Sequence, residues 1–424
     1  MPKNLKIIIF DGSFKTTPFI NRLAKGLVLN HQVYILGFNE KISQPVAGIT
    51  YVSLGSNQSK LKFTGTTLSK LLQSKKFNLL FPTLRKLIQG KRQELQQQNL
   101  DLALKNISPD IIHLQWPSVI PWFKEVLLKQ EIPVILSQRG FHNNVRPFVD
   151  EANFEYLKKW YPKMAGFHSV SKAIAANGNK IWTSPKKIDK VIYTGLPLQE
   201  ISFSENYMRS IPLKLLSIGR AHWIKGYDYA LHTCKQLKEK NIPFLYTIIG
   251  GAVDEELRFL VADLGLEDCV FLENRRSQKE VFKLMAEAAL LLMPSLDEGI
   301  PNVVVEAMAI GLPVISTDCG GVPELIEEGV NGWMVPTRKP EAIAAAIIHF
   351  MELPLDMIEK VRIEARGKVE QQHNEAQMVL GMEELYYEVR STKYEVRSTK
   401  LEVRSVKYWF RSMDLRINIE VNNS

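Results

Sequence analysis

The chain has 424 residues, 45% of them hydrophobic, and a formal net charge of +9. This length predicts two domains instead of one core. Cys234, Cys269 and Cys319 stand far apart with no Cys-x-x-Cys pair, so the sequence indicates neither disulfides nor a cysteine metal site. No apolar run is long enough to cross a bilayer. We therefore expect a cytoplasmic protein, either free or peripheral on the cytoplasmic face of a membrane.

The first half alternates short apolar strands with helical stretches. Leu5–Phe10 and Gln32–Leu36 are predicted strands, and between them Gly12 lies in a turn where a glycine lets the backbone approach a ligand. Pro109–Leu114 and Ile132–Leu136 are two further strands. Arg139 and His142 follow the last of these. Each is either an ordinary surface polar group or part of a site, where the planar fork of Arg139 suits an anionic acceptor or a phosphate.

A basic, apolar stretch covers residues 41–93, which contain no Asp or Glu. Lysine and arginine are interleaved there with leucine and phenylalanine, a composition that suits an anionic membrane surface or a phosphorylated acceptor. The alternative is an amphipathic surface helix whose lysine stems lie on apolar surface. Because no nucleic-acid-binding motif accompanies the charge, we expect no nucleic-acid partner.

The second half opens with the predicted strand Leu213–Gly219, which is followed by Arg220 and Lys225. Two cations beyond a strand end can neutralise a departing diphosphate, although a bare pair of this kind is also common on surfaces. Strands at Phe244–Ile249 and Cys269–Leu272 follow, each with a helix after it.

The most informative stretch is a predicted strand–loop–helix–strand unit from residue 290 to residue 316. The strand Leu290–Met293 leads into a polar loop, a helix that begins near Pro301 and a stop signal at Gly311. Glu298 and Glu306 are eight residues apart on the loop and the helix. They either bind the hydroxyls of a phosphate-bearing ligand at the strand ends, or they merely favour the helix dipole and contact solvent.

This unit resembles the E-x7-E signature of the retaining nucleotide-sugar glycosyltransferases of family four, which have the GT-B architecture. The matching residues are Glu298, Gly299, Pro301, Asn302, Glu306, Ala307, Ala309, Gly311, Pro313 and Val314. The resemblance continues through residues 320–324 and 329–332, and Gly219–Arg220 with Lys225–Gly226 resembles the family's phosphate-binding element. It implies an α/β fold in which two doubly wound, Rossmann-like domains face each other across a cleft.

The resemblance also implies roles for individual residues. Arg220, Lys225 and Glu298 would be catalytic, with the two cations on the donor diphosphate and Glu298 on the sugar hydroxyls. Glu306 would bind the ribose. The remaining donor-binding candidates are Gly12, Arg275 near the base, and the backbone of Gly299, Ile300, Pro301 and Asn302. Relatives have a histidine before Gly140, where this chain has Arg139, so Arg139 and His142 are the acceptor-side candidates.

The implied domain division is a first domain at 1–195, a linker at 196–212, a second domain at 213–370 and a helix returning to the first domain at 371–386. Residues 387–424 contain the repeat YEVRSTK, YEVRSTK, LEVRSVK. The repeat places apolar residues neither at a and d of a heptad nor on one face of a strand. We expect a tail beyond the folded enzyme.

The implied reaction moves a sugar from a nucleotide diphosphate, such as a UDP- or GDP-sugar, to an acceptor hydroxyl with retention of configuration. Cell-surface polysaccharide or glycolipid synthesis is the expected setting, with a glycan or lipid-linked acceptor. Since no Asp-x-Asp motif and no His or Cys cluster is present, we expect no metal and no cofactor. The rivals are another GT-B sugar-nucleotide enzyme, such as an epimerase or a phosphorylase, and a non-catalytic sugar-nucleotide-binding subunit.

Overall fold

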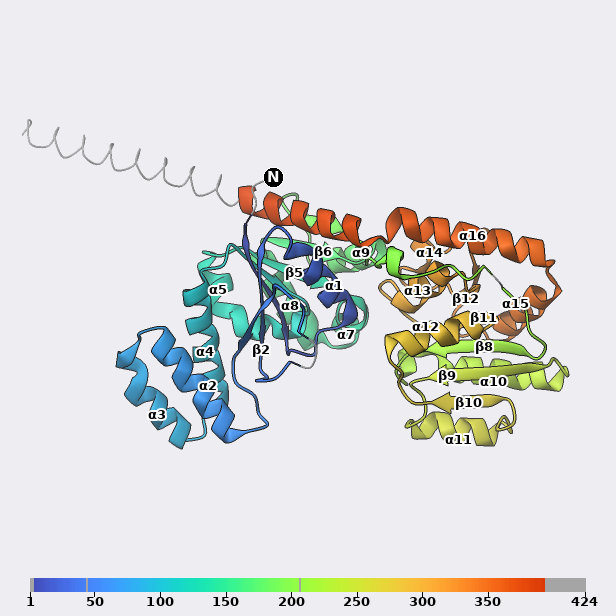
Figure 1. Ribbon diagram of the computed structural model, residues 1–424, viewed down its shortest axis with the longest axis horizontal. Coiled ribbons are helices and arrows are strands. Elements are labelled where there is room, and N and C mark those ends of the chain that lie inside the picture. The colour runs from blue at the N-terminus through green and yellow to red at the C-terminus, as the bar shows by residue number, and fades with distance from the viewer. Residues whose placement is uncertain (1–3, 43–44, 206, 393–424) are drawn as a thin grey trace, which may run out of the picture.

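The computed structural model describes residues 4–42, 45–205 and 207–392, which form two domains side by side (Figure 1). Each domain is built on one parallel sheet, with strand orders β3-β2-β1-β4-β5-β6-β7 and β10-β9-β8-β11-β12-β13. The first sheet comprises β1 (Lys6–Gly12), β2 (Gln32–Gly37), β3 (Thr50–Ser53), β4 (Ile111–Leu114), β5 (Val134–Gln138), β6 (Gly166–Ser169) and β7 (Asp189–Val191). The second comprises β8 (Leu213–Ile218), β9 (Phe244–Ile249), β10 (Val270–Glu273), β11 (Leu290–Met293), β12 (Val314–Thr317) and β13 (Trp333–Val335).

Helices cover both faces of each sheet, as parallel strands that are apolar on both sides require. The helices of the first domain are α1 (Pro18–Leu27), α2 (Lys60–Gln73), α3 (Leu80–Ile88), α4 (Arg92–Ile107), α5 (Lys124–Lys129), α6 (Gly140–Asn144), α7 (Arg146–Val149), α8 (Glu151–Trp160) and α9 (Lys172–Ile181). Those of the second are α10 (Tyr227–Glu239), α11 (Glu255–Asp263), α12 (Gln278–Glu287), α13 (Asn302–Ile310), α14 (Val322–Leu325), α15 (Pro340–Glu352) and α16 (Leu355–Gln372). The predicted pair of doubly wound domains is confirmed.

Two strands, β3 and β13, lie at sheet edges and were not predicted from the sequence. They are four and three residues long, and β3 has no fully buried residue. Such short strands contain too few residues for an alternating or continuous apolar pattern to be recognised in the sequence. An edge strand also has a neighbouring strand on one side only, so fewer of its side chains need to be apolar. The central strands, by contrast, begin and end within about two residues of their predicted positions, since their apolar runs are buried on both faces.

The chain crosses back from the second domain to the first near its end. After α16 a bridge joins Asn374 to Leu196, and residues 375–392 form a helix against the first sheet (Figure 1). Met382, Leu385 and Tyr386 of this helix are fully buried, and Val389 is 2% exposed. The helix therefore runs past position 387, where we expected the tail to begin, because the first repeat places Val389 in the core. Residues 393–424 lie outside the described part of the chain.

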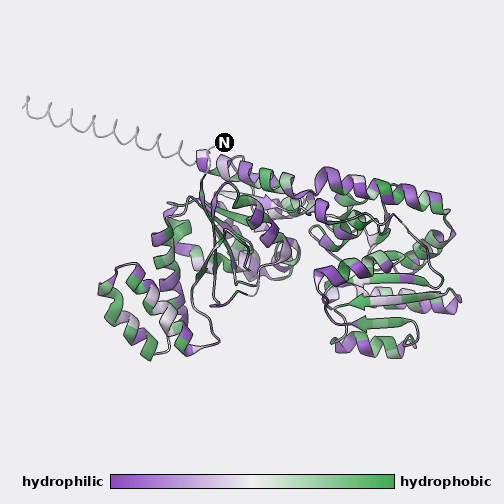
Figure 2. Ribbon diagram, in the orientation of Figure 1, coloured by the Kyte–Doolittle hydropathy of each residue, from purple (hydrophilic) through white to green (hydrophobic). Residues whose placement is uncertain are grey.

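The basic stretch folds as a helical pair, α2 and α3, at the end of the first domain that faces away from the second (Figure 1). Figure 2 shows hydrophobic residues along α3. None of the described helices combines the length and apolar character needed to span a membrane. The cysteines are free and buried, as expected for small core residues.

Candidate active site

A cavity of about 540 Å³ lies between the two domains. The first domain contributes Thr17, Phe19, Trp116, Ser118, Arg139, Gly140, Phe141, His142, Val170 and Thr194, and the second contributes Arg220, Glu298, Gly299, Ile300 and Asn302. These residues follow the carboxyl ends of strands in both sheets, which is where ligands bind in doubly wound domains. Seven of the sequence-predicted site residues line this cavity: Arg139, His142, Arg220, Glu298, Gly299, Ile300 and Asn302. Lys225, Pro301 and Glu306 do not line it themselves.

Lys225 and Glu298 form an ion pair at the second-domain wall of this cavity, with Lys225 Nζ 2.5 Å from Glu298 Oε1. Ser295 Oγ donates to the same carboxylate oxygen over 2.9 Å. Gly226 has a φ of +61°, and a Cβ there would lie 2.1 Å from the carbonyl oxygen of Pro294. A glycine is therefore required for the turn after β8 to approach the loop after β11, and that approach joins lysine and glutamate.

The loop that carries Glu298 is held by backbone contacts. The Gly321 amide donates to the Glu298 carbonyl over 3.1 Å, and a Cβ at Gly320 would lie 1.8 Å from that oxygen. Pro301 is the N-cap of α13, so the helix begins one residue after the predicted position, and Gly311 ends the helix in the left-handed conformation. The N-terminus of α13 consequently faces the cavity, where its dipole favours an anion.

Glu306 lies in the second turn of α13, where Gln278 Nε2 donates to its carboxylate over 3.2 Å. Burial raises the pKa of Glu306, while the charge of Arg22 opposes that shift. Arg22 belongs to α1 of the first domain, so the two domains place opposite charges near the end of the cleft. The sequence analysis missed Arg22 because an arginine in an amphipathic helix has no distinguishing pattern.

Arg139 and His142 lie on the opposite, first-domain wall. The centre of the Arg139 guanidinium is 4.2 Å from the ring centroid of Phe19, and Nη2 donates to Gln115 Oε1 over 3.3 Å. Burial lowers the pKa of His142, and the nearby charges of Arg146 and Arg220 add to this effect. His142 is therefore neutral near pH 7, which leaves it able to donate or accept a hydrogen bond.

Direct hydrogen bonds connect the two domains beside the cavity. Asn144 Nδ2 donates to both carboxylate oxygens of Asp297 at 3.0 and 3.1 Å. Glu324 in α14 accepts from the amides of Lys172 and Ala173, each over 2.9 Å, at the N-terminus of α9. Ser171 is the N-cap of that helix, and its side chain accepts a hydrogen bond from the Ile174 amide. These contacts fix the width of the cleft.

Two candidates lie apart from these contacts. Gly12 ends β1 with a φ of +83°, and its nearest neighbour, Val119, leaves room for ordinary van der Waals contact with a Cβ. Arg275 is exposed in the loop between β10 and α12, while Arg276 beside it pairs with Glu273. Neither Gly12 nor Arg275 lines the cavity. Among the described residues, no group of three or more His, Cys, Asp or Glu side chains is placed to hold a metal ion.

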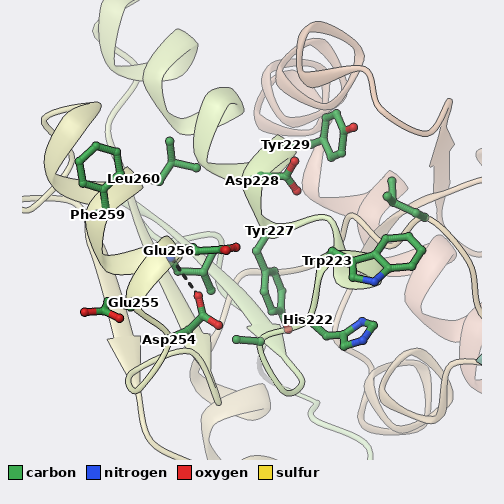
Figure 3. A pocket seen from close by; sticks show the side chains of 13 residues that line it. His222, Trp223, Tyr227, Asp228, Tyr229, Asp254, Glu255, Glu256, Phe259 and Leu260 are labelled. Carbon is green, nitrogen blue, oxygen red and sulfur yellow. Dashed lines mark hydrogen bonds between the residues drawn. The ribbon is translucent and has the colours of Figure 1, made fainter.

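A larger hollow of about 700 Å³ lies within the second domain, between the turn at 222–225, the start of α10 and the start of α11 (Figure 3). Figure 3 shows Asp228, Asp254 and Glu256 around Tyr227 and Trp223. Glu255 and the aromatic ring of Phe259 also belong to its lining. These acids would repel a diphosphate, whereas the interdomain cavity contains Arg220, which would attract one.

Comparison with solved structures identifies the architecture. A glycosyltransferase from Rickettsia africae has a TM-score of 0.69 at 17% identity, covering 91% of this chain and 98% of that one. HepE of Anabaena, solved in complex with UDP-glucose, has a TM-score of 0.67 at 16% identity and covers 90% of this chain and 98% of its own. The fold is GT-B. In this GT-B chain, residues 200–368 match the model of the family "Glycosyl transferases group 1".

Curated relatives of this GT-B chain are also glycosyltransferases by name. The amylovoran biosynthesis glycosyltransferase AmsK of Erwinia amylovora is 34% identical over 240 residues, or 52% of this chain and 56% of that protein. WcaL of Salmonella typhimurium, whose name assigns it to colanic acid biosynthesis, is 35% identical over 198 residues, or 45% of this chain and 48% of its own. The chain thus matches these two relatives over about half of their length.

Proposed function

We propose that this protein is a retaining glycosyltransferase of family four that moves a sugar from a nucleotide-diphosphate donor to an acceptor hydroxyl. The observation that carries the proposal is that Arg220 and Glu298 line one interdomain cavity beside the N-terminus of α13, while Lys225 is ion-paired to Glu298. The match to glycosyl transferases group 1 and the GT-B fold support the same reaction. The names of AmsK and WcaL favour a role in polysaccharide synthesis.

In the proposed reaction, the bond between the anomeric carbon and the diphosphate oxygen breaks, and the electron pair leaves with the diphosphate. The acceptor oxygen forms the new bond and loses its proton. Arg220 and Lys225 stabilise the negative charge that develops on the leaving group. Glu298 binds sugar hydroxyls once the donor has drawn Lys225 towards its phosphate, and Glu306 binds the ribose. We assign no nucleophile, and we propose that the reaction needs no metal.

A nucleotide-sugar screen tests this proposal. UDP- and GDP-sugars are added to the full chain, thermal stabilisation identifies the donor, and that donor is incubated with and without EDTA. We expect stabilisation, slow hydrolysis that EDTA does not change, and release of the sugar in its original anomeric form, which proton NMR detects. Interconversion of the bound sugar would favour an epimerase. Binding without hydrolysis or transfer would favour a non-catalytic subunit.

We further propose that the α2–α3 pair docks on an anionic membrane surface, which would present a lipid-linked acceptor. Large apolar side chains project from the pair: Leu61, Leu72, Phe77, Phe81 and Ile88 are all at least 60% exposed. Lys60, Lys62, Lys75, Lys76 and Arg85 accompany them, and the stretch has no acid before Glu94. Exposed apolar side chains with flanking cations suit insertion at the level of anionic headgroups.

Vesicle flotation tests the membrane proposal. The full chain should float with vesicles of phosphatidylglycerol and phosphatidylcholine, and replacement of Phe77 and Phe81 by Ser should abolish flotation without changing donor binding. Val253 and Phe259, which are also exposed but lie in the second domain, provide the matched control when replaced by Ser. Equal flotation with purely zwitterionic vesicles, or undiminished flotation of the Phe77 and Phe81 variant, would contradict this docking.

A further inference from the structure

The guanidinium of Arg139 is a partly buried cation whose surroundings supply no negative charge. Arg139 follows β5 and precedes α6, and its side chain lies against the ring of Phe19 at the interdomain cavity. Its closest hydrogen-bond acceptor is the neutral amide oxygen of Gln115 at 3.3 Å, and its Nε is buried without a partner. Within the described residues, no Asp or Glu oxygen lies within 4.0 Å of this guanidinium.

Two other arginines whose side chains are largely buried have acid partners. Arg362 pairs with Glu359 and donates to the Gly311 carbonyl over 2.6 Å, and Arg366 donates to Glu370 over 2.6 Å. Removing a guanidinium from water is costly unless a counter-charge or a full set of acceptors replaces the water. Arg139 has neither among the described residues, so its charge is available to a ligand.

The hydroxyl of Ser137, which lies next to Arg139, already contacts two histidines. Ser137 Oγ lies 2.8 Å from His113 Nε2 and 2.9 Å from His168 Nδ1, and 3.5 Å from Arg139. Burial lowers the pKa of His168 to about 3, so this network is neutral near pH 7. It positions the guanidinium but does not neutralise it.

The remaining charges on the cavity wall also leave Arg139 unmatched. Glu298 is the cavity's carboxylate, and it is already paired with Lys225 across 2.5 Å. Arg220, on the same wall as Glu298, is assigned to the donor diphosphate. Arg139 belongs to the first domain, on the acceptor side of the cavity, where the carboxylate of a sugar would supply the missing negative charge. Trp116 beside Arg139 offers a ring against which a pyranose can stack.

We propose that Arg139 binds the carboxylate of a uronic acid, carried either by the transferred sugar or by the acceptor's terminal sugar. This inference rests on the proposed glycosyltransferase function and specifies its substrate class. A planar carboxylate matches the two parallel donors of a guanidinium, which makes this a strong and specific contact. The corresponding neutral sugar would leave the guanidinium unpaired, and the discrimination should be on the order of 10–100-fold.

Two arms distinguish the two sources. In the donor arm, the full chain is titrated with UDP-glucuronate and UDP-glucose. In the acceptor arm, the donor from the nucleotide-sugar screen is offered p-nitrophenyl glucuronide, its uronamide and the glucoside. We expect a preference of roughly 10-fold or more for the carboxylate in one arm only. Arg139→Gln should lower kcat/KM for the uronate by roughly 10-fold or more relative to kcat/KM for the neutral sugar, which removes the preference, and Arg139→Lys should keep part of it.

Arg146→Gln is the matched control, since Arg146 is an exposed arginine of the same domain that lies outside the cavity lining. It should retain the preference. If sugar transfer occurs but neither arm of the unmodified protein distinguishes uronate from uronamide, this inference is wrong and the proposed function stands. Equal loss of uronate and neutral substrates in Arg139→Gln would also overturn it, because it would indicate a purely structural arginine. If no nucleotide sugar binds at all, both proposals fail.

Discussion

Lys225 Nζ lies 2.5 Å from Glu298 Oε1, although the two residues are 73 positions apart in the chain. The pair is partly buried, so each charge lowers the cost of placing the other in the cleft. In the reaction that we propose, the donor diphosphate competes with Glu298 for the lysine, and the sugar hydroxyls replace the lysine at the carboxylate. The ion pair thus holds both functional groups beside the cavity that we propose for the donor.

Replacement of Lys225 by Ala should abolish sugar transfer, because the charge on the departing diphosphate loses its nearest cation. We expect kcat to fall by about 100-fold or more with the fold intact, as judged by circular dichroism. Lys235→Ala, which removes an exposed lysine of α10, should leave kcat unchanged. Turnover close to that of the unmodified protein would exclude Lys225 from the site.

Replacement of Glu306 by Ala should weaken binding of the free nucleotide by roughly 10–100-fold, because a carboxylate that accepts two ribose hydrogen bonds is lost. Isothermal titration with UDP and GDP measures this effect. Glu287→Ala, at the end of α12, serves as the control. If the affinity of Glu306→Ala for the free nucleotide equals that of the control, the ribose assignment is wrong.

Replacement of Glu324 by Ala should loosen the contact between the domains. Its carboxylate accepts two backbone hydrogen bonds from the N-terminus of α9 and one from Tyr193. We expect a larger radius of gyration in small-angle scattering and a KM for the donor that rises by about 10-fold, since the cleft no longer stays closed. Glu327→Ala, close by but exposed, should change neither quantity. An unchanged radius and KM would show that the contact does not control the cleft.

Replacement of Asp297 by Asn should change how stability depends on pH. Burial raises the pKa of Asp297 from 3.8 to about 6. The native state therefore holds this proton more tightly than the unfolded chain, so Asp297 lowers the free energy of unfolding as pH rises from about 4 to 6. Asp297→Asn has no carboxyl group to titrate and so does not lose this stability. The melting temperature of the variant minus that of the unmodified protein should therefore increase by a few degrees from pH 4 to pH 7. The exposed Asp263→Asn should show no such gain, and a pH-independent difference for Asp297→Asn would refute the shift.

Removal of the last helix should unfold the first domain. We compare a chain that ends at residue 392 with one that ends at residue 374 and therefore lacks the last helix. Met382, Leu385 and Tyr386 of this helix are fully buried in the first domain. The shorter chain exposes that apolar surface and also loses the 2.8 Å hydrogen bond between Tyr386 and His113. We expect soluble, donor-binding protein from the chain ending at 392 and aggregation of the chain ending at 374. Equal solubility and melting temperature would contradict the packing role of residues 375–392.

The sequence was sufficient to predict those features of this protein that depend only on a few neighbouring residues. The fully apolar strands and the Gly311 helix stop were predicted, because burial and backbone φ act over short distances in the chain. The spacing of Glu298 and Glu306 indicated a site for the same reason. Folding alone decided which distant residues share a cavity: Arg139 faces Arg220, Asn144 binds Asp297, and Val389 of the first repeat enters the core. These pairings depend on how two sheets and the returning helix pack, and packing is set by the sum of many weak contacts that no local pattern records.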